Sequence, residues 1–159
     1  MTFKQKIKTH YQNLLAEKIQ ELRFMISDLA RDAQNDAKGS AGDKHETALA
    51  MMHLEQEKLN HKLAENLNQK AIIDKIEANS KHNKVALGSL VQANEMRFYI
   101  SGALPKIQLE EKTIIAVSSE SPLGSQLMGK SEGDVIQINL NTFLIRTDRK
   151  STRLNSSHD

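Results

Sequence analysis

The chain has 159 residues, and its 22 Lys and Arg residues nearly balance its 20 Asp and Glu residues, for a formal net charge of +2. So small a charge gives no general case for wrapping DNA. Aromatic residues make up 4% of the chain and Trp is absent, which argues against a surface for stacking nucleic-acid bases. The absence of Cys excludes a disulfide framework, a cysteine-ligated zinc site and a thiol nucleophile.

The distribution of apolar residues gives no sign of a membrane segment. The longest apolar runs are a few residues long, which is too short to span a bilayer. The first residues lead directly into an amphipathic pattern and lack the apolar core of a signal peptide. We therefore expect a cytoplasmic protein with no membrane partner.

Residues 3 to about 38 predict one long helix. Its apolar residues recur at steps of three and four, which is helical spacing and approaches that of a coiled coil. The stripe consists of Ile7, Tyr11, Leu15, Ile19, Leu22, Ile26, Leu29 and Ala33. The pattern stops at Lys38-Gly39-Ser40-Ala41-Gly42, where two glycines permit the chain to reverse.

A second helix is predicted from near Asp43 to about Asn79. Its apolar stripe includes Ala48, Met52, Leu59, Leu63, Leu67 and Ile76. Two helices of similar length joined by a short Gly-containing turn predict an antiparallel coiled-coil hairpin over residues 1–79. Each arm would extend about 50 Å at 1.5 Å per residue.

The residues after the hairpin predict a small β-rich domain, so the expected fold class is α+β. A polar linker at 80–84 precedes the domain at 85–147. Five strands are predicted within Leu87–Ala93, Met96–Ser101, Thr113–Val117, Asp134–Leu140 and Thr142–Thr147. One short helix is predicted over Ser121–Met128, with Ser121 as its N-cap and Pro122 at its first position.

Residues 148–159 are predicted to be a non-native tail. Their sequence, from Asp148 to His158, resembles the in-frame translation of a common sequencing adapter. A polar disordered tail is the alternative interpretation. Both interpretations exclude the segment from the predicted fold.

The predicted turn carries two carboxylates, Asp43 and Glu46, three residues apart at the start of a helix. This spacing places both on one side of the first turn, where they form half of a site for a hard cation such as Mg²⁺. The other ligands would have to come from a partner. The structural alternative is a variant of the capping box, which would start the helix whatever the function, and spacing alone favours it.

Two segments resemble motifs of the bacterial Gre transcript-cleavage factors. The segment Gly42-Asp43-Lys44-His45-Glu46-Thr47-Ala48 resembles the family pattern G-D-x-x-E-N-A. The segment Ser121-Pro122-Leu123-Gly124-Ser125-Gln126-Leu127-Met128-Gly129-Lys130-Ser131-Glu132-Gly133-Asp134 resembles a longer and more specific motif of the same family. The resemblance covers roughly residues 3–147.

The resemblance implies a transcription elongation factor whose C-terminal domain has an FKBP-like fold. That domain would bind RNA polymerase at the rim of its secondary channel, and the hairpin would enter the channel. Asp43 and Glu46 match the acidic pair that helps hold a second Mg²⁺ in the polymerase active site, where backtracked RNA is hydrolysed. The partner-binding residues implied are Ser121, Pro122, Leu123, Gly124, Gly129 and Lys130. The chain would be a monomer with no enzymatic activity and no cofactor of its own.

Departures from the family pattern, which include an unusual turn at Lys38-Gly39-Ser40-Ala41, keep other interpretations open. Thr47 stands where the family commonly has Asn, and Leu49 and Ala50 stand where an acidic residue and Tyr are common. These departures leave room for a regulator or inhibitor that binds the channel without stimulating cleavage. The helical stripe alone fits a generic coiled-coil adaptor equally well. A stand-alone enzyme is the least favoured, because the sequence shows no nucleophile with a base and no complete metal site.

Overall fold

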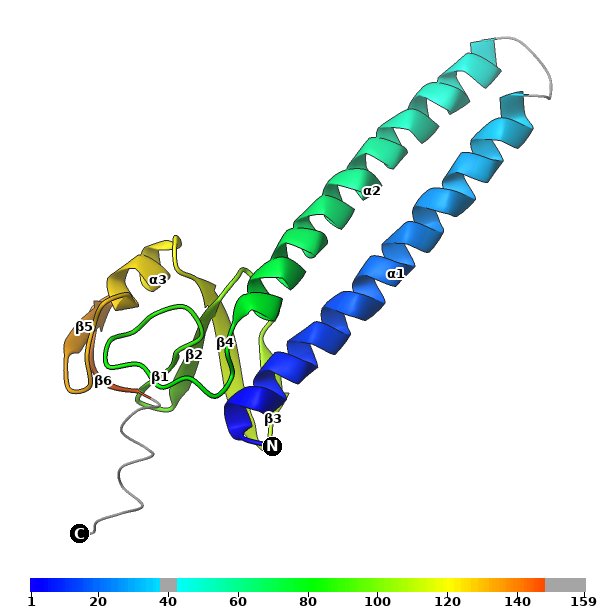
Figure 1. Ribbon diagram of the computed structural model, residues 1–159. Helices are drawn as coiled ribbons and strands as arrows, with labels where there is room; N and C mark the ends of the chain where they lie inside the picture. The colour runs from blue at the N-terminus through cyan, green and yellow to red at the C-terminus, as the bar shows by residue number, and fades with distance from the viewer. Residues whose placement is uncertain (38–42, 148–159) are drawn as a thin grey trace. The chain divides into compact units, whose positions relative to one another are not determined.

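A computed structural model of the chain describes residues 1–37 and 43–147, with side chains described for residues 1–34 and 46–147. Two long helices, α1 (Phe3–Ala37) and α2 (Asp43–Lys75), come first (Figure 1). They are followed by β1 (Leu90–Ala93), β2 (Met96–Ser101), β3 (Ile107–Leu109), β4 (Lys112–Ser118), α3 (Pro122–Leu127), β5 (Val135–Ile138) and β6 (Asn141–Thr147). The α+β class and the predicted order, with a helical pair before a β-rich domain that has one short helix, are confirmed.

The chain forms two compact units. One is the helix-pair unit, Tyr11–Ala71, and the other is the sheet unit, which combines Met1–His10 with Ile72–Asp159. The predicted domain boundaries at residues 79 and 85 stay predictions. Within the described residues, no helix has the length and apolar content needed to cross a membrane.

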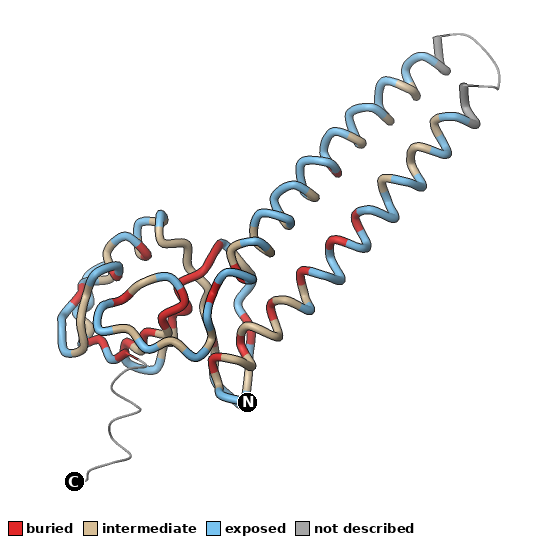
Figure 2. Tube along the Cα trace, viewed as in Figure 1, coloured by how far each residue is buried: buried red, intermediate tan, exposed pale blue. Residues whose placement is uncertain are grey.

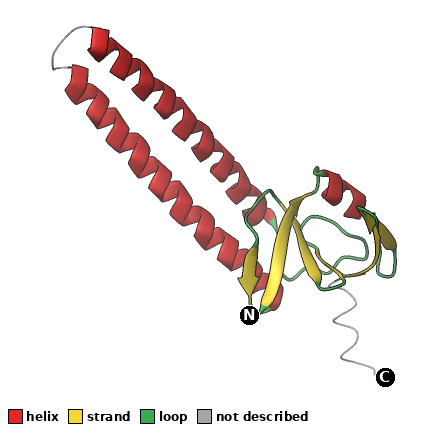
Figure 3. Ribbon diagram, turned by 180° about the vertical axis from the view of Figure 1, so that it is seen from behind, coloured by secondary structure: helices red, strands yellow, loops and turns green. Residues whose placement is uncertain are grey.

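In the helix-pair unit, α1 and α2 lie side by side and run in opposite directions (Figures 1 and 3). The predicted stripe of α1 faces inward, because Tyr11, Leu15, Ile19 and Leu22 are all at most 6% exposed (Figure 2). From α2, Leu59 is buried to a similar extent. Burying each of these large side chains contributes about 1.5–3 kcal/mol relative to leaving it in water.

One member of the predicted α2 stripe is wrong. Leu67 is 39% exposed, whereas the neighbouring Asn66 is half-buried. The inward face of α2 follows Leu59, Leu63, Asn66 and Lys70, with steps of four, three and four. The predicted stripe from Leu59 through Leu63 to Leu67 takes two steps of four residues. Such a series rotates away from the seam, so Leu67 lies outside it. The helix also ends at Lys75, earlier than the predicted residue 79.

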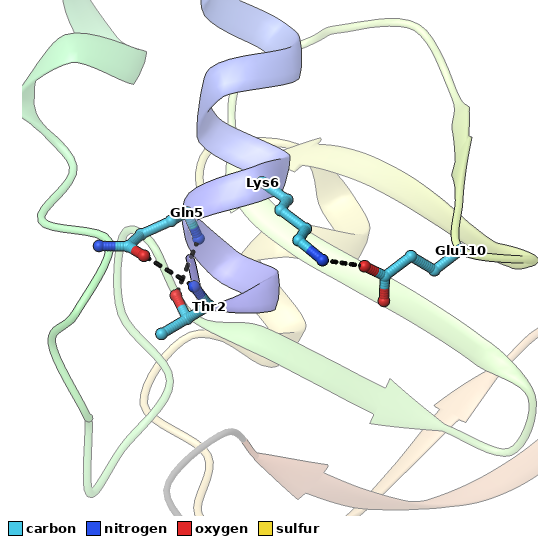
Figure 4. A network of polar contacts seen from close by, with 4 residues as sticks. All are labelled: Thr2, Gln5, Lys6 and Glu110. Carbon is cyan, nitrogen blue, oxygen red and sulfur yellow. Dashed lines mark hydrogen bonds and ion pairs between the residues drawn. The ribbon is translucent and has the colours of Figure 1, made fainter.

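The start of α1 belongs to the sheet unit and has a reciprocal cap. Thr2 Oγ1 accepts a hydrogen bond from the Gln5 backbone N–H at 3.1 Å, and the Thr2 backbone N–H donates to Gln5 Oε1 at 2.7 Å (Figure 4). This capping box satisfies two N–H groups that the helix itself leaves unpaired. One turn later, Lys6 forms an ion pair with Glu110 in the turn between β3 and β4 (Figure 4).

The sheet has six strands in the order β3-β4-β2-β1-β6-β5. Strands β2 and β4 are parallel, and the other neighbouring pairs are antiparallel. Strand β3 was not predicted, since its three residues are too few to show an alternating pattern. The core lies between one face of the sheet and α3, and includes Val91, Phe98, Ile100, Leu127, Ile136 and Ile145.

The opposite face of the sheet is partly covered by the start of α1. Tyr99 and Ile114, which alternate with core-facing residues, are fully buried on this second face. The Phe3 ring lies under the Lys112 ammonium group, with Nζ 4.8 Å from the ring centroid. The first turns of α1 therefore pack against the β4 side of this face.

The turn between β3 and β4 generates a prediction about stability. Both of its central residues, Glu110 and Glu111, have positive φ, at 52° and 66°. Two-residue hairpin turns of this kind favour Gly, which has no Cβ atom to strain, and Asn, whose short polar side chain can form local hydrogen bonds there. Glu111→Gly should raise the free energy of unfolding by about 0.5–1 kcal/mol, measured by urea denaturation. Glu110→Gly should gain less, since it also removes the ion pair with Lys6. An unchanged or lowered urea midpoint for Glu111→Gly contradicts the account.

A second prediction concerns alkaline pH. Burial raises the pKa of the Tyr11 phenol from 10.0 to about 12. The folded chain therefore holds this proton more tightly than the unfolded chain, so stability is lost as the pH rises from 10 to about 12. In denaturation series across that range, Tyr11→Phe should show a shallower loss than the unaltered chain. Identical slopes for the two proteins contradict the prediction.

Candidate functional site

The first turn of α2 presents an exposed carboxylate. The helix begins at Asp43, so positions 43 and 46 both lie within this turn. The Glu46 side chain is exposed, and no side chain in the described residues forms a hydrogen bond or ion pair with it. The positive end of the helix dipole favours a negative charge at this position. Glu46 is therefore free to bind a cation or a donor supplied by a partner.

The structure does not test the second member of the predicted acidic pair. The helical backbone starts at Asp43, but the Asp43 side chain lies outside the described residues. The predicted chain reversal at residues 38–42 also lies outside them. The pairing of Asp43 with Glu46 accordingly stays a prediction.

The described residues hold no cluster of three or more His, Asp or Glu side chains that could bind a metal ion. A divalent cation at Glu46 would need most of its oxygen ligands from elsewhere. Mg²⁺ is commonly bound by one or two protein carboxylates, with water and phosphate oxygens completing its coordination. The predicted metal role of this turn therefore stays a prediction.

The second predicted site surrounds α3, and its sequence motif has clear structural roles. Ser121 is the N-cap, as predicted, because its Oγ accepts a hydrogen bond from the Gly124 N–H at 3.0 Å. A Cβ atom on Gly124 would lie 1.8 Å from the Ser118 carbonyl oxygen, so only glycine fits there. Leu123 is half-buried and packs against the core. These residues build α3, whether or not a partner also contacts them.

The loop after α3 is tied to the chain that enters the sheet. Gly129 has a φ of +80°, and its N–H donates to the Val85 carbonyl at 2.9 Å. The Val85 N–H in turn donates to the Lys130 carbonyl at 2.8 Å. Of the predicted partner-binding residues, Pro122 and Gly129 are exposed and Lys130 is half-buried. Pro122 and the Lys130 side chain are therefore the members best placed to contact a partner.

Sequence reasoning missed two features of the sheet unit. Met128 follows α3 and is 37% exposed, next to the predicted partner-binding residues. A cavity of about 740 Å³ lies on the second face of the sheet, with Arg97 and Arg146 in its wall. The sequence signal for the cavity was the alternation of cationic residues with apolar ones in β2 and β6. The strand order is needed to show that these cationic residues lie close together.

Comparison with known proteins gives a structural similarity and no sequence match. No family model and no curated protein matches the chain. Among solved structures, the chain is similar to one described as the structure of the transcription factor Gfh1. The two share 16% sequence identity, and the match covers 85% of this chain and 89% of the other with a TM-score of 0.34.

The two glycines of the α3 motif should differ sharply in their tolerance of a side chain. Gly124→Ala places a methyl group against a backbone oxygen, so it should lower the free energy of unfolding by about 3 kcal/mol or more. Gly129→Ala meets open space, and only its positive φ opposes the change, at a cost of about 1–2 kcal/mol. Urea denaturation of both variants tests this order. Equal losses, or a greater loss at Gly129, would refute the packing argument.

Proposed function

We propose that this chain is a transcription elongation factor that binds bacterial RNA polymerase in its secondary channel and stimulates cleavage of backtracked RNA. The observation that carries the proposal is the exposed Glu46 in the first turn of α2, without a partner among the described residues. The resemblance of residues 42–48 and 121–134 to two motifs of the Gre factors supports it independently.

In the proposed chemistry, the chain supplies only part of the ligands of a metal ion. Phosphodiester hydrolysis by two metal ions needs carboxylate oxygens that hold the ions, and the ions stabilise the negative charge that develops on the attacking and leaving oxygens. Glu46, together with Asp43, would supply oxygens to the more weakly bound Mg²⁺ in the polymerase active site. The polymerase would supply the other Mg²⁺ and its ligands, so the chain needs no cofactor of its own.

The helix pair has the dimensions that the proposal needs. Helices of 35 and 33 residues extend about 50 Å at 1.5 Å per residue. The first turn of α2 lies at one end of this pair (Figure 1). An acidic group at the end of a narrow rod could reach a buried active site that a globular domain could not enter.

The surface around α3 is proposed to hold the chain at the channel rim. Pro122 and Met128 are exposed, and Lys130 adds a positive charge beside them. This combination of apolar contact and a single cation is suited to a protein partner that has an acidic residue. Docking and cleavage would thus depend on different surfaces of the chain.

A regulator that binds the channel without cleavage is a second candidate. It is favoured by Thr47, Leu49 and Ala50, which replace residues that the Gre pattern commonly has next to the acidic pair. Thr47 and Ala50 are exposed, so their identities can affect a partner directly. Polymerase binding with inhibited RNA synthesis and no cleavage selects this candidate.

A coiled-coil adaptor without polymerase contact is the third candidate. Phe24, Met51 and Leu54 on the helix pair are between 66% and 67% exposed, so apolar surface is available for association. Concentration-dependent self-association in sedimentation, together with no binding to polymerase, selects this candidate.

The cleavage proposal is tested with a backtracked elongation complex and Mg²⁺. Glu46→Gln and Asp43→Asn should each slow RNA shortening by about 10–100-fold, because each removes a negatively charged metal ligand. Glu57→Gln is the matched control, since Glu57 is also an exposed carboxylate of α2. Binding of all variants to polymerase should be unchanged. Shortening at the normal rate in both Glu46→Gln and Asp43→Asn rejects the metal role.

A further inference from the structure

The cavity on the second face of the sheet lies wholly within the sheet unit. Its volume is about 740 Å³, within the range of roughly 300–1,000 Å³ that small-molecule sites occupy. Residues 2–4 together with Ala78, Asn79 and Lys81 form one side, and strands β1, β2 and β6 contribute most of the other. The start of α1 leaves this part of the sheet open.

A row of three polar side chains crosses the floor of the cavity. Gln92 on β1 pairs with Arg97 on β2 and with Arg146 on β6, so the three side chains share one face of the sheet. Neighbouring strands are about 4.8 Å apart, which places the two arginine backbones about 10 Å from each other. No described carboxylate forms a salt bridge with Arg97 or Arg146.

Further cations give the cavity a charge that the chain as a whole lacks. Lys81 is exposed at its wall, and Lys112 lies over the Phe3 ring. The acidic residue of the lining, Glu132, is already engaged, because its Oε1 accepts a hydrogen bond from the Thr147 N–H at 2.6 Å. In a chain of net charge +2, this concentration of positive charge is local. Low-dielectric walls around such a group strengthen its attraction for anions.

The cavity also has apolar walls. Phe3, Leu90 and Leu144 line it, and Leu144 is 54% exposed. A free inorganic anion would leave these side chains in contact with water. A ligand with both an anionic group and an organic body would cover them and neutralise the arginines.

We propose that this cavity binds an organic polyphosphate of the nucleoside diphosphate class. The planar guanidinium groups of Arg97 and Arg146 can each bind a phosphate by paired hydrogen bonds, so together they could hold two linked phosphates. The organic body would lie against Phe3 and Leu90. This proposal goes beyond the proposed function and does not depend on it, since none of these residues belongs to α2 or α3.

The test is isothermal titration of the full chain with ADP and, separately, with inorganic pyrophosphate. ADP should bind with a stoichiometry of one, and pyrophosphate should compete for the site more weakly. Arg97→Gln and Arg146→Gln should each weaken ADP binding by about tenfold or more, as expected for loss of a charge-assisted contact. Arg23→Gln, at an exposed position on α1, is the matched control and should bind ADP normally.

Further measurements keep the outcome clear. Arg97 is half-buried, so Arg97→Lys, which keeps the charge and loses the planar fork, should bind ADP with intermediate affinity. Circular dichroism establishes that each variant is folded. Absence of ADP binding overturns the proposal, as does equal affinity in Arg146→Gln. Equal affinity for pyrophosphate and ADP overturns the proposed role of the organic body of the ligand. Tight binding of single-stranded RNA that ADP cannot displace overturns the proposal and assigns the surface to nucleic acid.

Discussion

Burial of the apolar stripe of α1 is the constraint on which the rest of the structure depends. A helix of 35 residues with one apolar face gains most of its stability from covering that face. In the sheet unit, Ile7 is fully buried, and in the helix-pair unit Tyr11, Leu15 and Leu22 are at most 2% exposed. A single uninterrupted stripe therefore contributes to the cores of both units.

The seam between the helices weakens toward the start of α2. Ile26, Leu29 and Ala33 are only half-buried, in contrast to the fully buried residues earlier in α1. On α2, Leu59 is buried, but Met52 and Ala48 are half-buried. Less apolar burial lowers the local free energy of unfolding, and functional segments are commonly drawn from such regions. The exposed carboxylate of Glu46 thus lies at the less buried end of the helix pair.

The elements that could be predicted were those with a strong local signal. The long stripe of α1 and the Ser121-Pro122 start of α3 are encoded in neighbouring residues, and both are confirmed. The seam of α2 was partly mispredicted because it includes polar residues, Asn66 and Lys70, while the apolar Leu67 lies outside it. Strand β3 was missed because its three residues are too few to show an alternating pattern. The turn after β3 consists of two glutamates at positive φ and contains none of the residues usual in such turns.

The candidate sites also differ in how much of each could be predicted from neighbouring residues. Asp43 and Glu46 are close in sequence, so a helix start was enough to place both in one turn. The motif around α3 was recognised, but sequence could not separate residues that build the helix from residues available to a partner. Arg97, Gln92 and Arg146 come together only through the order of β2, β1 and β6. That order includes the antiparallel pairing of β1 with β6, which joins strands that lie far apart in the sequence.

Photo-crosslinking from position 46 tests the central claim most directly. A photoreactive residue would replace Glu46, and another would replace Glu111 in the sheet unit as a reference. In a backtracked elongation complex, position 46 should crosslink to the 3′ end of the RNA or to the catalytic residues of the polymerase, and position 111 should not. Crosslinks from position 46 only to the outer surface of the polymerase, or to a second copy of the chain, would contradict the account.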